Sequence, residues 1–160
     1  MATRAKKTVT IGTLTEWNAL DASVGVIIVK SNSFNGGSFK TMDMTRFVNL
    51  AGLVVGDKSC MYVNELKLMG LNELESVEIG MKSFMRQSGA SSGYSGSFYL
   101  KNCPKVKSLK IGEYSFSDYR VIGIENVDAL EVIEMGDVNE KSYNFSFASL
   151  ELKSILIHDE

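Results

Sequence analysis

Three segments of the chain repeat one pattern of apolar residues that closes on a glycine. They are residues 74–80, 106–112 and 130–136, and each reads apolar, any, any, apolar, any, apolar, Gly. Residues 50–56 form a fourth copy, residues 24–30 a fifth, and residues 152–158 resemble a truncated last copy. Self-similarity at a fixed period is the signature of repeat architectures, so the chain is expected to fold as a stack of similar units.

The spacing of the repeat glycines defines the period. Gly56, Gly80, Gly112 and Gly136 are separated by steps of 24, 32 and 24 residues. The long step contains the Gly/Ser-rich stretch 88–96, and removing eight residues there as an insertion restores the period. Because glycine and serine favour loops, this stretch is predicted to be a flexible loop within one domain.

A second apolar run follows each early copy, after a Ser-Phe or Ser-Cys pair at residues 33–34, 59–60, 83–84 and 115–116. The run alternates with period two, which is typical of a strand with one buried face. Gly70, Asn102 and Asn126 share one position that suits a left-handed turn. The apolar members of the run are Met42-Met44-Phe47, Leu66-Leu68-Leu71, Phe98-Leu100-Cys103, Ile122-Ile124-Val127 and Phe145-Phe147-Leu150.

These two runs predict the fold class. Each coil of about 24 residues carries two short strands, and stacked coils bury a core that one coil cannot bury alone. We expect a mainly β, right-handed leucine-rich-repeat-type solenoid with about five to six coils and parallel sheets. One domain spans 1–160, with an irregular N-terminal coil at 1–21, repeats at 22–150 and a truncated C-terminal coil at 151–160.

The coil pattern resembles that of a known family. The Leu-x-x-Leu-x-Ile-Gly-x-x-Ser-Phe order, as in residues 106–116, is similar to the leucine-rich repeats of BspA-type microbial surface antigens. The resemblance covers about residues 22–157. It implies a curved right-handed solenoid with a parallel sheet along one face, used for protein contact and not for catalysis. The chain departs from ordinary leucine-rich repeats in lacking the asparagine of Leu-x-x-Asn-x-Leu.

Composition argues against several classes of partner. The net charge is −2, and basic residues cluster only at Arg4, Lys6 and Lys7, so nucleic acid is not an expected partner. No apolar run approaches the length that crosses a bilayer, so a membrane is not expected either. The first residues lack the apolar core of a secretion signal, which predicts a cytoplasmic location, or a surface or extracellular one if the chain is a fragment.

One outward-facing column of the first strand is the candidate interaction face. It runs through Ile28, Val54, Glu78, Lys110, Glu134 and Leu156, with Val26 in the neighbouring column. Parallel strands lie about 4.8 Å apart, so the three charged residues form a ladder of surface ion pairs. The alternative is a carbohydrate-active or carbohydrate-binding site that uses Glu78, Lys110 and Glu134.

No catalytic, metal or cofactor site is predicted. His158 is the only histidine and lacks a facing partner. Cys60 and Cys103 replace apolar residues of the core columns, and free cysteine behaves there as a small hydrophobe. Asn144-Phe145-Ser146 matches a glycosylation sequon, which we interpret as a chance triplet. Tyrosines that we expect to reach solvent are interface anchor candidates: Tyr94, Tyr99, Tyr114, Tyr119 and Tyr143.

The function hypothesis is a non-enzymatic repeat scaffold that binds protein, either a foreign partner or copies of itself. Neither end shows an amphipathic helix pattern or a proline-rich cover. Uncapped coils expose strand edges and core, so head-to-tail assembly into an oligomer or filament is one alternative. The other alternative is a monomeric binding module whose ends are capped by local folding.

The predicted register can be tested at one pair of neighbours. Ile124 faces the core and Glu125 faces solvent. We expect Ile124→Lys to destabilise the domain by several kcal/mol, roughly the cost of an unpaired buried charge, and Glu125→Lys to change the free energy of unfolding by less than about 0.5 kcal/mol. Urea melts of both variants measure the difference, and equal costs would contradict the register.

Overall fold

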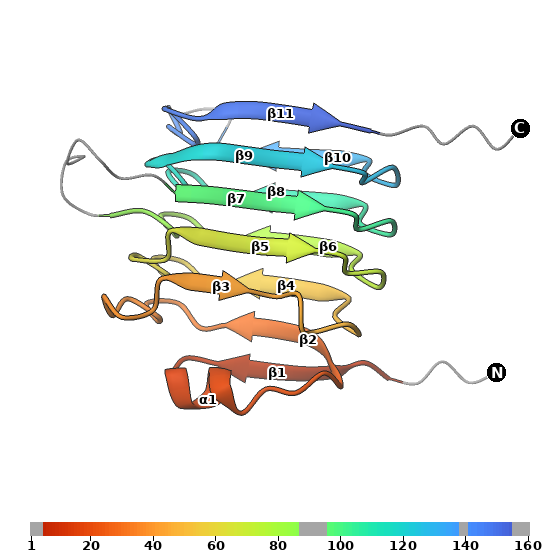
Figure 1. The fold of residues 1–160 in the computed structure, drawn as a ribbon. Helices are drawn as coiled ribbons and strands as arrows, with labels where there is room; N and C mark the ends of the chain where they lie inside the picture. Colours follow the sequence, from red (N-terminus) through yellow and green to blue (C-terminus); the bar gives the residue numbers. More distant parts are fainter. Residues whose placement is uncertain (1–4, 87–95, 138–140, 155–160) are drawn as a thin grey trace, which may run out of the picture.

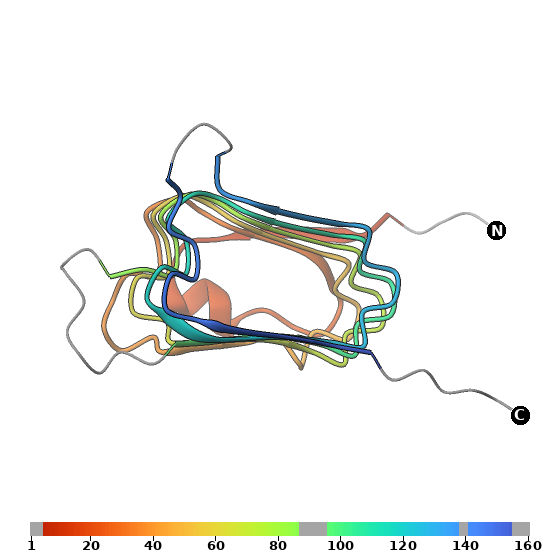
Figure 2. The ribbon, with the colours of Figure 1, turned by 90° about the horizontal axis from the view of Figure 1, so that it is seen from above.

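A computed structural model describes residues 5–86, 96–137 and 141–154 of the chain. The fold is mainly β, with two all-parallel sheets whose strands alternate along the chain, the arrangement of a β-solenoid of stacked coils (Figure 1). Seen along the stack in Figure 2, successive coils nearly superpose as one flattened outline, with the two sheets on its long sides. The predicted mainly β fold with parallel sheets is therefore confirmed.

The first sheet, called sheet A, contains the first strand of each coil, and sheet B contains the second. Sheet A has the order β1-β2-β4-β6-β8-β10 and sheet B the order β11-β9-β7-β5-β3. The elements are β1 (Lys7–Ile11), α1 (Leu14–Asn18), β2 (Val24–Val29), β3 (Thr41–Asp43), β4 (Gly52–Val55), β5 (Glu65–Met69), β6 (Ser76–Ile79), β7 (Gly96–Lys101), β8 (Ser108–Ile111), β9 (Tyr119–Glu125), β10 (Val132–Met135) and β11 (Ser149–Lys153).

Strand pairing confirms the predicted period and its insertion. Leu53 pairs with Val77 across an ordinary step, and Val77 pairs with Leu109 across the long step without loss of register. The alternating residues of both strands point into the space between the sheets and are almost fully buried in the inner coils. A residue such as Leu100 therefore packs between its counterparts in the coils on either side, Leu68 and Ile124.

The repeat glycine permits a close approach between successive coils. A Cβ at Gly56 would lie 2.5 Å from the Ser31 backbone nitrogen, and one at Gly112 would lie 2.5 Å from that of Met81. Such distances are incompatible with any larger residue unless the backbone shifts. The glycine that closes the repeated motif is thus a requirement of coil stacking.

A serine lies three residues after Gly56, Gly80 and Gly112, and these serines link the coils through a ladder of hydrogen bonds. The Ser83 hydroxyl donates to the Gly56 carbonyl at 2.8 Å and accepts from the Ser59 backbone N–H at 3.2 Å. Ser115 repeats this pattern one coil later, donating to the Gly80 carbonyl and accepting from the Ser83 N–H at 2.9 Å. Because Ser59, Ser83 and Ser115 are fully buried, their hydroxyls must find partners within the protein, and backbone groups of neighbouring coils provide them.

The turns between the sheets use left-handed backbone at fixed positions. Gly70, Asn102 and Asn126 have φ between 53° and 68°, as their shared position predicts, and the Asn126 side chain donates to that of Asn102 at 2.8 Å. The aromatic residue after the ladder serine is also left-handed: Phe84 and Phe116 have φ of 53° and 59° and stack with ring centroids 4.7 Å apart.

The last coil differs from the sequence prediction. Leu150 pairs with Ile122 and Leu152 with Ile124, so residues 149–153 form the second strand of the coil and do not begin a further first strand. Phe145 occupies the turn position, stacked on Phe116 at 5.1 Å. Gly112 precedes its phenylalanine by four residues and Gly136 precedes Phe145 by nine, so five inserted residues displaced the alignment. The predicted register of Phe145-Phe147-Leu150 was therefore wrong: Phe145 and Phe147 precede the strand, and Leu150 takes the position predicted for Phe145.

Two further predictions are corrected. Gly96 begins β7 and belongs to the core, because a Cβ there would lie 2.5 Å from the Tyr119 ring. Residues 88–95 of the predicted loop, Tyr94 among them, lie outside the described residues. Tyr119 is not solvent-reaching. It is fully buried, and its hydroxyl donates to the Val63 carbonyl.

The N-terminal coil is closed by a short helix that the sequence analysis did not expect. Thr13 caps α1 by accepting from the Glu16 N–H at 3.2 Å, and the helix buries Trp17 beneath the first complete coil. The Arg46 guanidinium lies over the Trp17 ring, 5.3 Å from its centroid, and donates to the Trp17 carbonyl. The expectation that neither end carries a covering helix is therefore wrong for this end.

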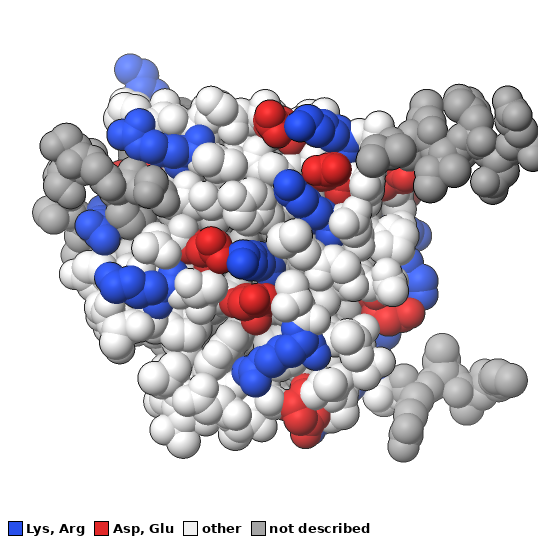
Figure 3. All heavy atoms as spheres, in the orientation of Figure 1, with Lys and Arg blue, Asp and Glu red and all other residues white. Residues whose placement is uncertain are grey.

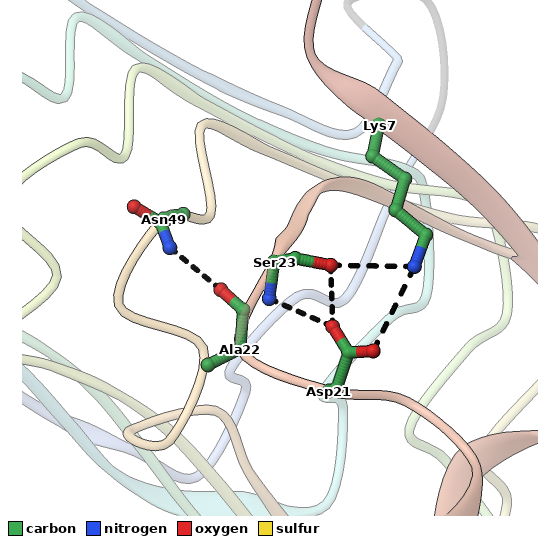
Figure 4. A network of polar contacts seen from close by, with 5 residues as sticks. All are labelled: Lys7, Asp21, Ala22, Ser23 and Asn49. Carbon is green, nitrogen blue, oxygen red and sulfur yellow. Dashed lines mark hydrogen bonds and ion pairs between the residues drawn. The ribbon is translucent and has the colours of Figure 1, made fainter.

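A polar network fastens the same end (Figure 4). Asp21 accepts from the Ser23 N–H at 2.8 Å and lies 3.8 Å from the Lys7 ammonium of β1, while Asn49 donates to the Ala22 carbonyl at 2.7 Å. The hydrogen bonds from Ser23, with the charge of Lys7, lower the pKa of Asp21. These contacts join the turn before β2 to the coils on both sides.

The serine ladder predicts a position-dependent cost of losing one hydroxyl. Ser83→Ala removes the hydroxyl partner of the buried Ser59 N–H and of the partly buried Gly56 carbonyl, so we expect a loss of about 1–3 kcal/mol in the free energy of unfolding. Ser33→Ala is the matched control, because its half-buried hydroxyl bonds only the Lys30 carbonyl of its own coil. Its cost should stay below about 1 kcal/mol in the same urea melts, and equal losses would contradict the ladder.

Candidate functional site: the outer face of sheet A

Five of the six residues predicted for the outward column lie on one line across sheet A. Ile28 pairs with Val54, Val54 with Glu78, Glu78 with Lys110, and Lys110 with Glu134, each on the neighbouring strand. Val26 begins the adjacent column and pairs with Gly52. The sixth residue, Leu156, lies outside the described residues, as does His158.

The column divides into an apolar half and a charged half. Ile28 and Val54 are partly exposed on β2 and β4, and Val26 beside them is also partly exposed. Glu78, Lys110 and Glu134 are exposed on β6, β8 and β10. We call this surface, from Val26 and Ile28 to Glu134, the outer face of sheet A.

The charged half contains one ion pair. The Lys110 ammonium lies 3.7 Å from the Glu134 carboxylate, and both side chains are more than half exposed. Solvent screening limits such a pair to under about 1 kcal/mol. The Lys110–Glu134 pair therefore adds little to stability and mainly sets the pattern of charge on this face.

A shallow, open groove runs beside the charged half, where the strands of sheet A end. Residues directly after the repeat glycines add carboxylates to its wall, at Asp57, Glu113 and Asp137. The sequence analysis missed these three, although an acidic residue after the glycine in three of four copies is a readable signal. Asp57 also has a structural role, because its carboxylate accepts from the Met81 N–H at 2.9 Å.

The chemistry open to this face is limited by the position of Lys110. Glu78 and Glu134 lie two strands apart, roughly 9.6 Å at ordinary strand spacing, with the lysine between them. A pair of carboxylates at about that distance is at the upper limit for an inverting glycosidase. Among residues 5–86, 96–137 and 141–154, no three His, Cys, Asp or Glu side chains are grouped so that they could hold a metal ion.

The opposite face of the molecule, on sheet B, is charged along its length (Figure 3). Lys67 pairs with Glu65 at 2.9 Å on β5, and Lys101 pairs with Glu125 at 3.4 Å between β7 and β9. Lys101, Glu125 and Lys153 alternate in charge along one outward column of this sheet. The apolar half of the outer face of sheet A, by contrast, consists of adjacent aliphatic side chains.

The two cysteines and the sequon asparagine have structural contacts. Cys60 and Cys103 are unpaired thiols buried in the core, as predicted, and burial raises the pKa of both. The Asn144 amide donates to the Gly112 and Ser115 carbonyls at 2.8 and 3.0 Å, continuing the serine ladder into the last coil. A glycan on that nitrogen would disrupt both bonds, which favours the interpretation of the sequon as a chance triplet.

Comparison with known proteins finds no matching family model, curated protein or solved structure. The helical part of the described chain contains nothing long and apolar enough to cross a membrane.

The ion ladder makes a prediction about stability and salt. Lys110→Glu would place three carboxylates on adjacent strands, and we expect a loss of roughly 0.5–1 kcal/mol at low ionic strength. Because the charges are exposed, about 1 M salt should remove most of that loss. Lys110→Gln, which removes the pair without adding repulsion, should cost less and depend less on salt. Urea melts at two salt concentrations measure both variants; a salt-independent loss would contradict the ladder.

Proposed function

We propose that the protein is a non-enzymatic scaffold that binds another protein on the outer face of sheet A. The observation that carries the proposal is the division of that face, in which partly exposed Val26, Ile28 and Val54 adjoin a ladder of exposed charges. An apolar patch beside polar residues is the usual composition of a protein-binding surface.

The backbone of the face supports binding at low entropic cost. Six hydrogen-bonded parallel strands hold the side chains in fixed columns, so few groups are ordered when a partner arrives. Ser76 and Ser108, which are exposed and partly exposed, lie in the column beside the charged one, and small residues there let a partner approach the sheet closely.

We further propose that the coil is a version of the BspA-type leucine-rich repeat. The resemblance rests on the Gly-x-x-Ser-Phe part of the motif, and each of these residue types has a stacking role here. Gly112 allows close approach to the preceding coil, Ser115 joins the buried ladder, and Phe116 stacks on its neighbours. The family's implied use in protein contact agrees with the proposed scaffold.

A carbohydrate-active face remains the competing proposal, and one substitution separates the two. Glu134→Gln removes a carboxylate that hydrolysis would require, so an enzyme would lose turnover of polysaccharide while keeping its melting temperature. A protein-binding face would keep its partner, because the apolar half is unchanged.

The scaffold proposal is tested by a matched pair of substitutions on opposite faces. Val54→Glu puts a charge into the apolar half of the outer face of sheet A, and Val121→Glu makes the same change at an outward position of β9 on sheet B, where Val121 is 40% exposed. A photo-crosslinking residue at position 28 should capture a partner in an extract of the native cells. Val54→Glu should reduce capture at least about tenfold, and Val121→Glu should leave it unchanged. Equal capture by both variants would contradict the proposal.

A further inference from the structure

The two ends of the solenoid are finished differently. In the column of Ile124, the inner residue is 2% exposed, whereas its counterpart in the last coil, Leu152, is 60% exposed. The first strand behaves in the same way, because Ile111 is 3% exposed and its counterpart Met135 is 41% exposed. Core positions of the last coil thus form an apolar end surface, which we call the open end: Ile133, Met135, Leu150 and Leu152.

At the N-terminal end, the described core positions are covered more fully. Ile11 of β1 is fully buried and Trp17 of α1 is 8% exposed. The helix lies within the outline of the coils beneath β3, where another strand of sheet B would otherwise stack (Figures 1 and 2). Among the described residues, β11 is the edge strand of sheet B at the open end, and β3, above the helix, is the edge strand at the other end.

An open β edge beside exposed core residues is a template for pairing with another chain. The edge strand β11 carries Glu151 and Lys153 on its outward side, 3.1 Å apart, with Leu150 and Leu152 on its inward side. The edge strand thus carries one negative and one positive side chain, so the charges of two copies of the same edge can pair with each other.

The pattern on β11 is self-complementary about a two-fold axis. In an antiparallel pair of two β11 strands centred on Leu152, Glu151 of each copy lies opposite Lys153 of the other, and the two Leu152 side chains meet on the core side. A pair centred on Glu151 would instead oppose two carboxylates. Charge therefore selects the Leu152 register over its neighbour.

We propose that the open end is the docking surface for the open end of a second copy, forming a closed, tail-to-tail dimer. The dimer extends sheet B across the two-fold axis and covers the exposed leucines of both copies. It uses the end of the solenoid and not the outer face of sheet A, so it stands or falls separately from the proposed function.

Head-to-tail growth would extend sheet A only. A second copy added in the same direction would bring β1 onto β10, but on sheet B it would bring α1, and not a strand, onto β11. It would also place the exposed leucines against an end whose apolar side chains are already largely covered. An isologous contact uses two open ends and leaves none, so assembly stops at two copies.

Light scattering and analytical ultracentrifugation of the full chain test the proposal. The expected mass at tens of micromolar is twice that of the chain. Leu152→Lys should raise the dimer dissociation constant at least about a hundredfold, because the two-fold axis brings the two new charges together. Leu14→Lys is the matched control at the closed end, where Leu14 is 47% exposed, and should leave the constant unchanged. A monomeric parent, or a mass that keeps growing with concentration, would overturn the dimer.

A charge exchange on β11 tests the register. Glu151→Lys and Lys153→Glu each create like-charge neighbours across the axis, so each should weaken the dimer about tenfold at low salt. The double variant restores opposite charges, and its dissociation constant should return to within about threefold of the parent. Additive weakening in the double variant would overturn the Leu152-centred pairing. Circular dichroism melts check that every variant remains folded.

Discussion

Each coil of this protein can bury its apolar side chains only against the coil next to it. A pair of short strands has too little surface to form a core, so the side chains of Leu53, Val77 and Leu109 stabilise the fold through one another along the stack. The same dependence explains the glycines that allow close approach and the serines that satisfy buried backbone. Within the described residues, the first and last coils each have a neighbour on one side only, and their core positions differ in exposure: Ile11 is fully buried, whereas Leu152 is 60% exposed.

The sequence predicts the interior well because the interior is periodic. Each inward position is determined twice, by alternation along the strand and by recurrence in the next coil, so the columns through Ile124 and Cys103 were assigned correctly. The outward column from Ile28 to Glu134 follows from the same register, because a residue between two inward positions must face away from the core.

Prediction failed where that second determination is missing. Near Phe145 two alternating apolar runs overlap, and either could be the strand. The fixed distance from the repeat glycine would decide between them, but an insertion after Gly136 changes that distance. Gly96 was grouped with the loop by composition, although the Tyr119 ring is the reason for its lack of a side chain. The five-residue helix at Leu14–Asn18 is too short for helical periodicity to be visible, and only the Thr13–Glu16 capping pair marks it.

The left-handed residues in the turns have a consequence for how the chain accepts change. Every coil from Asn32 onward repeats a positive φ two residues before the aromatic position, occupied by residues as different as Lys58, Lys82 and Tyr114. A non-glycine residue in this region costs about 1 kcal/mol, and the cost recurs with each coil. The strain is thus a property of the coil's shape, independent of the side chain that occupies the site. The residue type at this position can therefore change while the backbone conformation stays the same. An array with more or fewer coils would carry backbone strain in proportion to its number of coils.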